Sequence, residues 1–175
     1  MEPAIRLRPV GEDDLGWFRL LRTDADFCGL DWKGFSDPGE PARRFAENGF
    51  LGEKVSWLVV ETVADEEAVA LVQWHPAPFA GNGHWEIGIV VFPERRGQGF
   101  GWRAQALLCD YLFAHTPVQR IQAGTHPENV AEQKALVRAG FQLEGVIRSC
   151  DFRGGAWHDG LLYSRLRTDP APDPT

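Results

Sequence analysis

The sequence has few cysteines and no long apolar segment. Its three cysteines, Cys28, Cys109 and Cys150, are widely spaced among 175 residues. This spacing fits neither a disulfide framework nor a zinc site, so we expect a reducing, cytoplasmic setting and no bound metal. No apolar run approaches the roughly 18–20 residues that a membrane-spanning helix needs. The opening residues MEPAIRLRPVGEDD also lack the apolar core of a signal peptide, so no membrane partner is expected.

A basic excess is missing as well. Lys and Arg total 18 against 25 Asp and Glu, which gives a net charge of −7. Nucleic-acid-binding domains usually carry a basic surface, so this balance argues against a nucleic-acid partner. Disorder of the whole chain is excluded because 43% of the residues are hydrophobic. The length suits one domain, which we expect over residues 1–168, followed by a disordered, proline-rich tail over 169–175.

Apolar periodicity and turn residues predict an α+β domain in three layers, with a mixed, mostly antiparallel sheet of about seven strands and about four flanking helices. The expected strands are 4–9, 55–63, 66–74, 84–92, 118–124, 141–152 and 156–166. The expected helices are 11–24, 41–49, 102–115 and 126–140. The last helix is expected to have Pro127 at its first position and Gly140 at its end. Around 41–49, residues 27–53 fit either a helix pair or a long irregular arm.

The most informative segment is FPERRGQGFG, residues 92–101, where a strand passes through a glycine-rich turn into a helix. Backbone N–H groups at a helix N-terminus have no partner within the helix, and the helix dipole favours anions there. Glycine allows a phosphate to approach the backbone closely, and Arg96 adds positive charge. The segment therefore indicates a pyrophosphate-binding turn, although a glycine cluster can also form a plain tight turn.

Two common phosphate-binding motifs do not fit this turn. A P-loop ends in Lys-Ser or Lys-Thr, and neither pair occurs in the chain. A Rossmann fingerprint has the spacing G-x-G-x-x-G near the first strand of a repeated βαβ unit, whereas G-x-G-x-G here follows hairpin strands beyond the midpoint. The remaining pattern, Arg-x-x-Gly-x-Gly at Arg96, Gly99 and Gly101, resembles the GNAT superfamily of N-acetyltransferases.

A second stretch extends the resemblance. Residues 127–148, PENVAEQKALVRAGFQLEGVIR, are similar to the branch that acetylates the N-termini of ribosomal proteins. That branch has an Asn early in a helix, then Gly-Phe, Glu-Gly and an Arg. The matching residues here are Asn129, Gly140, Phe141, Glu144, Gly145 and Arg148, and the sequence WHD at 157–159 is also common in the branch. The first 80 residues carry little specific resemblance.

The resemblance implies a GNAT fold and an acetyl-CoA-dependent enzyme that transfers acetyl to a primary amine by direct attack in a ternary complex. The implied coenzyme contacts are Val90, Val91, Phe92, Arg96, Gly97, Gln98, Gly99, Phe100, Gly101 and Asn129. In the family the thioester carbonyl meets backbone N–H groups at a strand bulge, here around 90–92. The acceptor is a small-molecule amine or a protein N-terminus, and a homodimer is a possible assembly.

Because a primary amine is mostly protonated near neutral pH, the site needs a base. Glu86 and Asp151 lie where family members carry catalytic carboxylates, although each could be a surface or salt-bridged acid and a water chain could replace both. The family's Tyr and Ser acid positions are occupied by Leu136 and Glu132. Glutamate would serve as an acid only if burial raised its pKa, and we expect Glu132 to be solvated. The thiolate of CoA could also leave without a general acid, since a thiol has a pKa of about 8.5. These departures leave open a non-catalytic acyl-CoA sensor.

The regions that determine the acceptor in the family are rich in aromatic and acidic residues here. The aromatic residues are Trp17, Trp32, Phe35, Phe79, Trp85 and Trp157. The acidic residues are Asp24, Asp26, Asp31 and Glu40. Such residues could form a wall for a cationic amine, or they could be core aromatics beside a solvated acidic surface.

Overall fold

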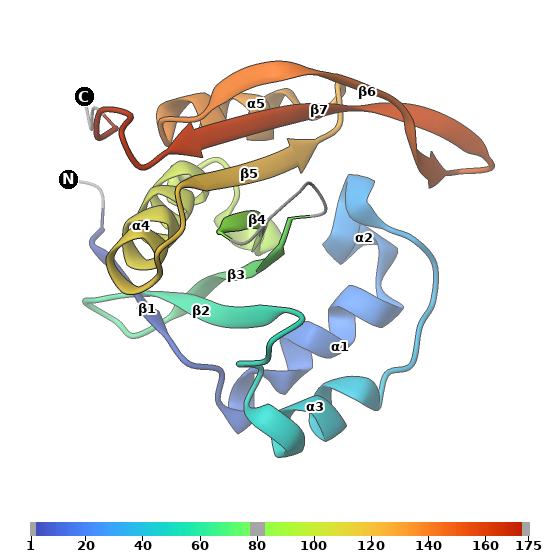
Figure 1. Ribbon diagram of the computed structural model, residues 1–175. Helices are drawn as coiled ribbons and strands as arrows, with labels where there is room; N and C mark the ends of the chain where they lie inside the picture. Colours follow the sequence, from blue (N-terminus) through green and yellow to red (C-terminus); the bar gives the residue numbers. More distant parts are fainter. Residues whose placement is uncertain (1–2, 78–82, 173–175) are drawn as a thin grey trace.

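The computed structural model describes residues 3–77 and 83–172, which form a single seven-stranded sheet flanked by helices (Figure 1). The strands are β1 (Ile5–Arg8), β2 (Ser56–Thr62), β3 (Ala68–Pro76), β4 (His84–Val91), β5 (Arg120–Thr125), β6 (Gln142–Arg153) and β7 (Ala156–Leu166). Their order in the sheet is β1-β2-β3-β4-β5-β7-β6. The predicted α+β class and the seven strands are confirmed.

Within residues 3–77 and 83–172, five α-helices rather than about four accompany the sheet, because residues after Asp24 fold into an additional short helix. The helices are α1 (Leu15–Thr23), α2 (Ala25–Cys28), α3 (Glu40–Asn48), α4 (Phe100–His115) and α5 (Val130–Arg138). Three short 3-10 turns are η1 (Glu12–Asp14), η2 (Gly29–Asp31) and η3 (Pro93–Arg95). Asp24 caps α2 by accepting a hydrogen bond from Phe27 N over 2.9 Å. The segment 27–53 therefore holds both helical turns and a connecting arm.

The two faces of the sheet bury separate cores. Side chains alternate along a strand, so Ile87, Ile89 and Val91 of β4 pack on the side of α4. Val90 and Phe92 point to the opposite side, where they pack with Trp17 of α1 and Phe27 of α2. Each face of β4 thus meets a different helical layer, with α1–α3 on one side and α4 on the other (Figure 1).

The sheet opens between β4 and β5. These strands form its parallel pair, and their register runs only from His84–Arg120 to Glu86–Gln122. Beyond this point β4 continues to Val91 while β5 pairs with β7. Within the described residues, the edge of β4 after Glu86 therefore has no strand partner on the β5 side. The backbone N–H and C=O groups on this edge can bind a ligand.

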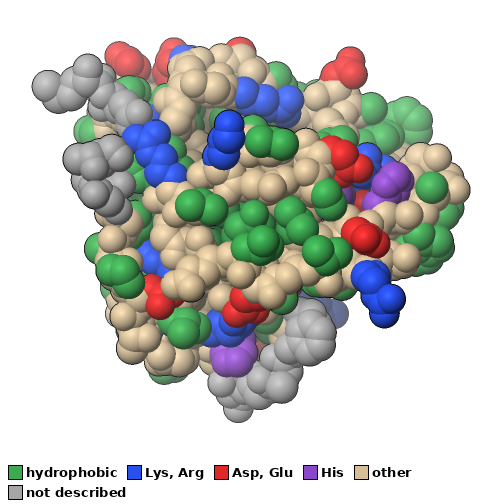
Figure 2. All heavy atoms as spheres, turned by 90° about the horizontal axis from the view of Figure 1, so that it is seen from above, with side chains coloured by type: hydrophobic (Ala, Val, Ile, Leu, Met, Phe, Trp, Pro, Cys, Tyr) green, Lys and Arg blue, Asp and Glu red, His purple; other side chains and the backbone are tan. Residues whose placement is uncertain are grey.

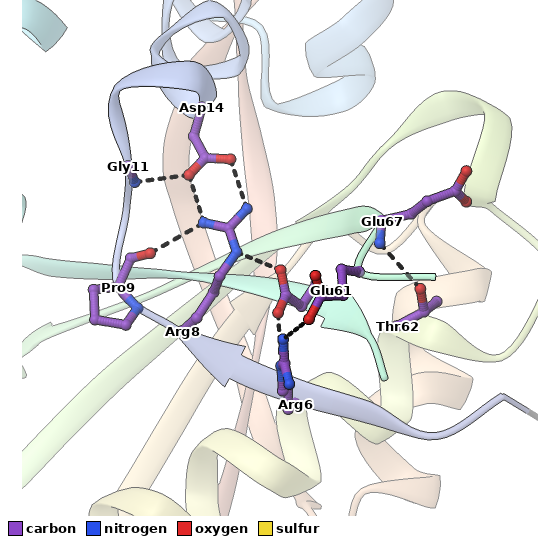
Figure 3. A network of polar contacts seen from close by, with 9 residues as sticks. Arg6, Arg8, Pro9, Gly11, Asp14, Glu61, Thr62 and Glu67 are labelled. Carbon is purple, nitrogen blue, oxygen red and sulfur yellow. Dashed lines mark hydrogen bonds and ion pairs between the residues drawn. The ribbon is translucent and has the colours of Figure 1, made fainter. Parts of the chain in front are cut away.

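An ion-pair network around two buried carboxylates, Glu61 and Asp14, joins the start of the chain to the sheet (Figure 3). Glu61 of β2 is 3% exposed and accepts a hydrogen bond from Arg6 Nε over 2.6 Å and another from Arg8. Arg8 also binds Asp14 through two nitrogens, at 2.6 and 2.9 Å. Burial alone would raise the pKa of Glu61, but hydrogen bonds from Arg8 and Arg6 hold it below its ordinary value. The network joins β1, β2 and η1 ahead of α1.

The edge strand β6 exposes apolar side chains. Leu143 is 56% exposed, Val146 58% and Ile147 40%. Figure 2, which looks onto the molecule from above the view of Figure 1, shows hydrophobic side chains gathered near the middle of this face.

At the C-terminal end of β7, Asp169 Oδ2 accepts a hydrogen bond from Leu166 N over 2.8 Å. Of the predicted disordered tail over 169–175, residues 173–175 lie outside the described residues, and the disorder of the tail stays a prediction.

Within the described residues, none of the helices is both long and apolar enough to cross a membrane. In the same residues, no group of three or more His, Cys, Asp or Glu side chains is arranged to hold a metal ion.

Candidate active site

A pocket of about 590 Å³ lies where β4, the glycine turn, η2 and α5 meet. Its lining residues are Cys28–Asp31, Ile89–Val91, Arg95–Gly97, Gly99–Trp102, Asn129, Ala131, Glu132, Lys134, Ala135 and Arg138. Eight of the ten predicted coenzyme contacts belong to this lining; Phe92 and Gln98 do not. Four cationic side chains, Arg95, Arg96, Lys134 and Arg138, also belong to it, so the pocket can neutralise an anion.

Two glycines give the turn its shape. Gly97 and Gly99 have φ of +73° and +76°, the left-handed region where other residues are strained. Gly99 is the N-cap of α4, so the first N–H groups of that helix open toward the turn. A Cβ placed on Gly97 would meet no atom within 4 Å. The space beside Gly97 is therefore open, and among the described residues no side chain caps the N-terminus of α4.

Gly101 has a different part from its two neighbours in the motif. A Cβ at this position would lie 3.7 Å from Ala135 Cβ and 3.8 Å from Val91 Cγ2. The glycine therefore lies where α4, α5 and the end of β4 come together. Helices α4 and α5 make a second contact at the next residue, Trp102, where the Arg138 guanidinium lies 4.3 Å from the centre of the Trp102 ring.

Arg96 connects the turn to the α2 side of the pocket. Its Nη2 donates to Phe27 O over 2.7 Å and its Nε to Val91 O over 3.2 Å. Gln98 Nε2 donates to Glu94 O over 3.0 Å, so the Gln98 side chain closes the turn itself.

The open edge of β4 presents alternate backbone groups. Phe92 N donates to Val69 O over 3.0 Å, and the Phe92 side chain is fully buried. Val91 O faces away from β3, because it accepts the Arg96 bond. Since N–H and C=O of one residue point to the same side, Val91 N–H and Ile89 N–H face the open edge. Ile89 was not among the predicted contacts, although the two-residue period of strand 84–92 could have indicated it.

The expected bulge around 90–92 is not found. The register between β3 and β4 is continuous from Trp85 to Val91, and the Phe92 bond to Val69 extends the ladder. The prediction was wrong because β3 is long enough to pair with β4 along this whole stretch.

Helix α5 begins at Val130, three residues after Pro127, which was predicted to be its first residue. Asn129 is its N-cap, and Asn129 Oδ1 accepts a hydrogen bond from Glu132 N over 3.2 Å. Asparagine satisfies a free N–H at a helix start, which proline cannot do with its side chain. The end at Gly140 is confirmed, since Phe141 N donates to Leu136 O over 3.0 Å past a left-handed Gly140 at φ +89°.

Glu132 is not the solvated residue that we expected. It is half-buried, lines the pocket and shares a hydrogen bond with the side chain of Gln105, which is 1% exposed. Burial and the nearby charge of Asp31 raise the pKa of Glu132 to about 8. The helix dipole would act in the opposite direction at this first-turn position, so removal from water dominates.

Glu86 lies at the point where β4 and β5 separate. It pairs with Gln122 in the last recorded step of the β4–β5 register, and Gln122 Nε2 donates to Glu86 Oε2 over 2.9 Å. By alternation along β4, Glu86 shares the face of Val90 and Phe92, which is the face that α1 and α2 cover. The carboxylate is thus half-buried with an amide partner.

Asp151 lies instead in a cluster of charged side chains. Lys33 forms an ion pair with Asp151 Oδ1, while His126 Nδ1 and Arg153 Nε each lie 3.6 Å from Asp151 Oδ2. The Lys33 bond holds the pKa of Asp151 below its ordinary value. Between the pairs Ile147–Gly160 and Asp151–His158, β6 has two more residues than β7, and this irregularity turns Asp151 toward the cluster.

His126 was missed by sequence reasoning. It follows β5 directly, is 8% exposed, and its Nε2 lies 3.3 Å from Asp31 Oδ1. His126 therefore lies between Asp31, which lines the pocket, and Asp151. The sequence signal for His126 was its position directly after the strand β5, which separates from its parallel neighbour β4 at Gln122.

The family comparison agrees with this geometry. The family model described as acetyltransferase (GNAT) domain matches residues 4–142. The chain belongs to the GNAT acetyltransferase family. The predicted membership of the GNAT superfamily is thereby confirmed.

One curated relative of this GNAT chain is the Bacillus subtilis protein described as probable N-acetyltransferase YjcK. The two are 32% identical over 83 residues, which are 47% of this chain and 46% of YjcK. The chain thus spans about half the length of YjcK, and the same holds for YnaD of Bacillus subtilis and p20 of Bacillus licheniformis.

Two solved structures share the GNAT fold over nearly the whole chain. RimJ of Mycobacterium smegmatis, solved with CoA-disulfide, has a TM-score of 0.75 and 25% identity over 95% of this chain and 83% of RimJ. Spermidine N-acetyltransferase of Vibrio cholerae, solved with CoA and spermine, has a TM-score of 0.82 and 20% identity. That match covers 94% of this chain and 96% of the other.

The predicted acceptor wall of this GNAT chain divides into core and surface. Trp17 stacks on Phe92 with ring centroids 4.2 Å apart, and Trp85 packs against the α4 core. Phe35 is 85% exposed beside Trp32, and Trp157 is 64% exposed. Phe79 lies outside the described residues.

The predicted acids divide in a similar way. Asp24 caps α2, and Glu40 forms an ion pair with Arg22. Asp26 is exposed. Asp31, by contrast, lines the pocket and contacts His126.

Proposed function

We propose that this chain is an acetyl-CoA-dependent N-acetyltransferase that acetylates a primary amine by direct attack in a ternary complex. The single observation that carries the proposal is the pocket of about 590 Å³, which joins the glycine turn to the open edge of β4. An elongated ligand with a phosphate end and a reactive end would occupy both parts.

The chemistry of the lining fits acetyl-CoA as the donor substrate. The N-terminus of α4 and the side chains of Arg95, Arg96, Lys134 and Arg138 suit its phosphates. The bound donor supplies a thioester whose carbonyl can accept hydrogen bonds. We assign Val91 and Ile89 N–H as the donors to that oxygen, in place of Phe92. Asn129, with Oδ1 used as a helix cap, has Nδ2 to offer the coenzyme arm.

Glu86 is the proposed base. The amine must lose a proton before it attacks, and a carboxylate within hydrogen-bond reach can accept that proton. Glu86 faces the α1–α2 side, away from the coenzyme helices, and its hydrogen-bond partner is neutral Gln122. Asp151 is a weaker candidate, because Lys33 stabilises its ionised form and lowers its pKa. Asp31 gives the acceptor side a negative charge that suits a cationic amine.

Binding and turnover test the proposal separately. Calorimetry is expected to show acetyl-CoA binding in the micromolar range, and absence of binding would overturn the proposal. A thiol-release assay with a panel of small amines and N-terminal peptides is expected to show turnover on at least one class. Acetyl-CoA binding with no turnover on any amine would favour the second candidate, a non-catalytic acyl-CoA sensor, which the Leu136 and Glu132 departures motivate.

A further inference from the structure

The geometry points to Glu132 as the proton donor to the sulfur that leaves the thioester. This inference rests on the proposed function, because it concerns the donor substrate in the same pocket. Leu136, at the family's tyrosine position, is fully buried and carries no proton to give.

The packing of α4 against α5 places Glu132 away from the phosphate end of the pocket. Arg138 lies over Trp102, Gly101 approaches Ala135, and Gln105 bonds Glu132. Gln105 lies one turn further into α4 than Gly101, so its partner Glu132 lies one turn beyond the contact with the last motif glycine. At about 1.5 Å per residue, the three residues from Ala135 to Glu132 span about 4.5 Å along the axis of α5, away from the phosphate end of the pocket.

The neighbours of Glu132 favour its neutral form. The charged groups that line the same pocket are Asp31 of η2, Arg95 and Arg96 of the turn, and Lys134 and Arg138 of α5. Among the described residues, no ion pair to Glu132 is found, and Asp31 is the charged neighbour that disfavours its ionisation. His126, beyond the start of α5, is turned to Asp31 and Asp151. Burial and Asp31 raise the pKa of Glu132 to about 8, so the carboxyl holds a proton at neutral pH.

Cys28 is a neutral proton-bearing group that also lines the pocket, and it is a poorer donor. Its Sγ already donates to Leu21 O over 3.4 Å. Burial and the charges of Asp31 and Asp24 raise the pKa of this thiol above its ordinary value. A thiol that holds its proton more tightly than the departing sulfur does not drive the transfer.

The transfer balances with one proton released. The carbon–nitrogen bond forms, the carbon–sulfur bond breaks, and the electron pair of that bond goes to sulfur. Sulfur takes the proton of Glu132, and Glu132 regains a proton from solvent. The ammonium form of the amine loses two protons through the base, so one proton leaves to the medium for each acetyl group transferred.

The test compares E132Q with E128Q. Glutamine keeps the shape of Glu132 and its contact with Gln105, but it has no acidic proton. Glu128 is an exposed carboxylate just before α5 and serves as the matched control. The first readout needs no turnover: carbon-13 NMR of glutamate side-chain carboxyls, with the Glu132 signal assigned by its loss in E132Q. We expect this signal to titrate with a midpoint of about 8 and to move when CoA saturates the protein, in wild type and in E128Q.

The second readout is the pH profile of turnover on an accepted amine. We expect kcat of wild type and E128Q to fall above about pH 8 as Glu132 ionises. In E132Q that alkaline decrease should be absent and kcat at neutral pH lower by on the order of 100-fold, the lower range for general acid catalysis.

Three results would overturn the role of Glu132: a carboxyl midpoint below about 6, no response of its signal to CoA, or a kcat of E132Q within about twofold of wild type. In each of these cases wild-type binding and turnover still stand, so the proposed function survives. If wild type neither binds acetyl-CoA nor releases thiol, both the function and the inference fail.

Discussion

Asn129 Oδ1 accepts a hydrogen bond from the backbone N–H of Glu132 over 3.2 Å. This bond starts α5 at Val130 and sets Glu132 in the first turn, on the pocket side of the helix. Asn129 therefore acts through the backbone as well as through any ligand contact. Asn129, which is typical of the family, and Glu132, which is not, thus form the same capped first turn of α5.

Replacing Gly99 by Asp should abolish coenzyme binding and leave the protein folded. The substitution places a negative side chain at the N-cap of α4, where the phosphates are proposed to lie. The left-handed backbone itself costs about 1–2 kcal/mol for a non-glycine residue. Calorimetry with acetyl-CoA and circular dichroism measure the two effects.

Gly154→Asp is the matched control for that strain. Gly154 is also left-handed, at φ +57°, and lies in the β6–β7 turn with open space around it. The control should lose similar stability but keep wild-type affinity. Unchanged affinity in G99D would contradict the assignment of the turn.

Replacing Glu86 by Gln should lower kcat on the order of 100-fold and leave acetyl-CoA affinity unchanged, because the base acts on the amine. Asp151→Asn should lower kcat no further than Lys33→Gln, which breaks the same ion pair but keeps the carboxylate. Steady-state kinetics of the three variants decides the matter. A larger loss in D151N than in E86Q would make Asp151 the base.

Glu132→Gln should stabilise the folded protein in mildly alkaline solution. The folded state holds a proton that the unfolded chain loses above about pH 4.5, so wild-type stability falls as pH rises from about 4.5 to about 8. Glutamine removes this penalty. We expect a gain of roughly 2 kcal/mol at about pH 8.5, less than the full shift implies because the side chain is only half-buried. Urea unfolding measures it, and a gain that is equal at about pH 4 would contradict this origin.

Glu61→Gln should destabilise the protein by roughly 2–3 kcal/mol near neutral pH. This is less than for a fully buried pair, because Arg6 and Arg8 are partly exposed. The pKa of Glu61 is lowered in the folded state, so its stabilisation is present above its ordinary value of 4.5 and is lost as the pH falls below it. Thermal unfolding should therefore show the wild type and E61Q converging in acid. A gap that stays constant with pH would indicate a packing defect instead.

The fold was largely predictable from sequence, because its strands alternate and its turns carry glycine or proline. The β6–β7 hairpin, for example, turns at Gly154 and Gly155, both left-handed. The glycine turn was predictable for the same reason, since few residues other than glycine adopt the conformations of Gly97 and Gly99.

The catalytic side of the site was less predictable, because it depends on contacts between distant segments. Glu132 looks like a solvated helix residue until Asp31, about a hundred positions earlier, and Gln105 of α4 are placed beside it. His126 gains its meaning only when Asp31 and Asp151 meet it from different elements. Burial and charge neighbours of this kind leave no local signal in the chain.

Arg96 holds Val91 O and Phe27 O with one guanidinium. The first carbonyl ends the strand beside the proposed coenzyme, and the second belongs to α2, on the proposed acceptor side. A ligand anion that draws the Arg96 guanidinium toward the turn also changes its hydrogen bond to Phe27 O of α2. The affinities of the two substrates are then thermodynamically coupled, and reciprocity requires each to change the affinity of the other by the same factor.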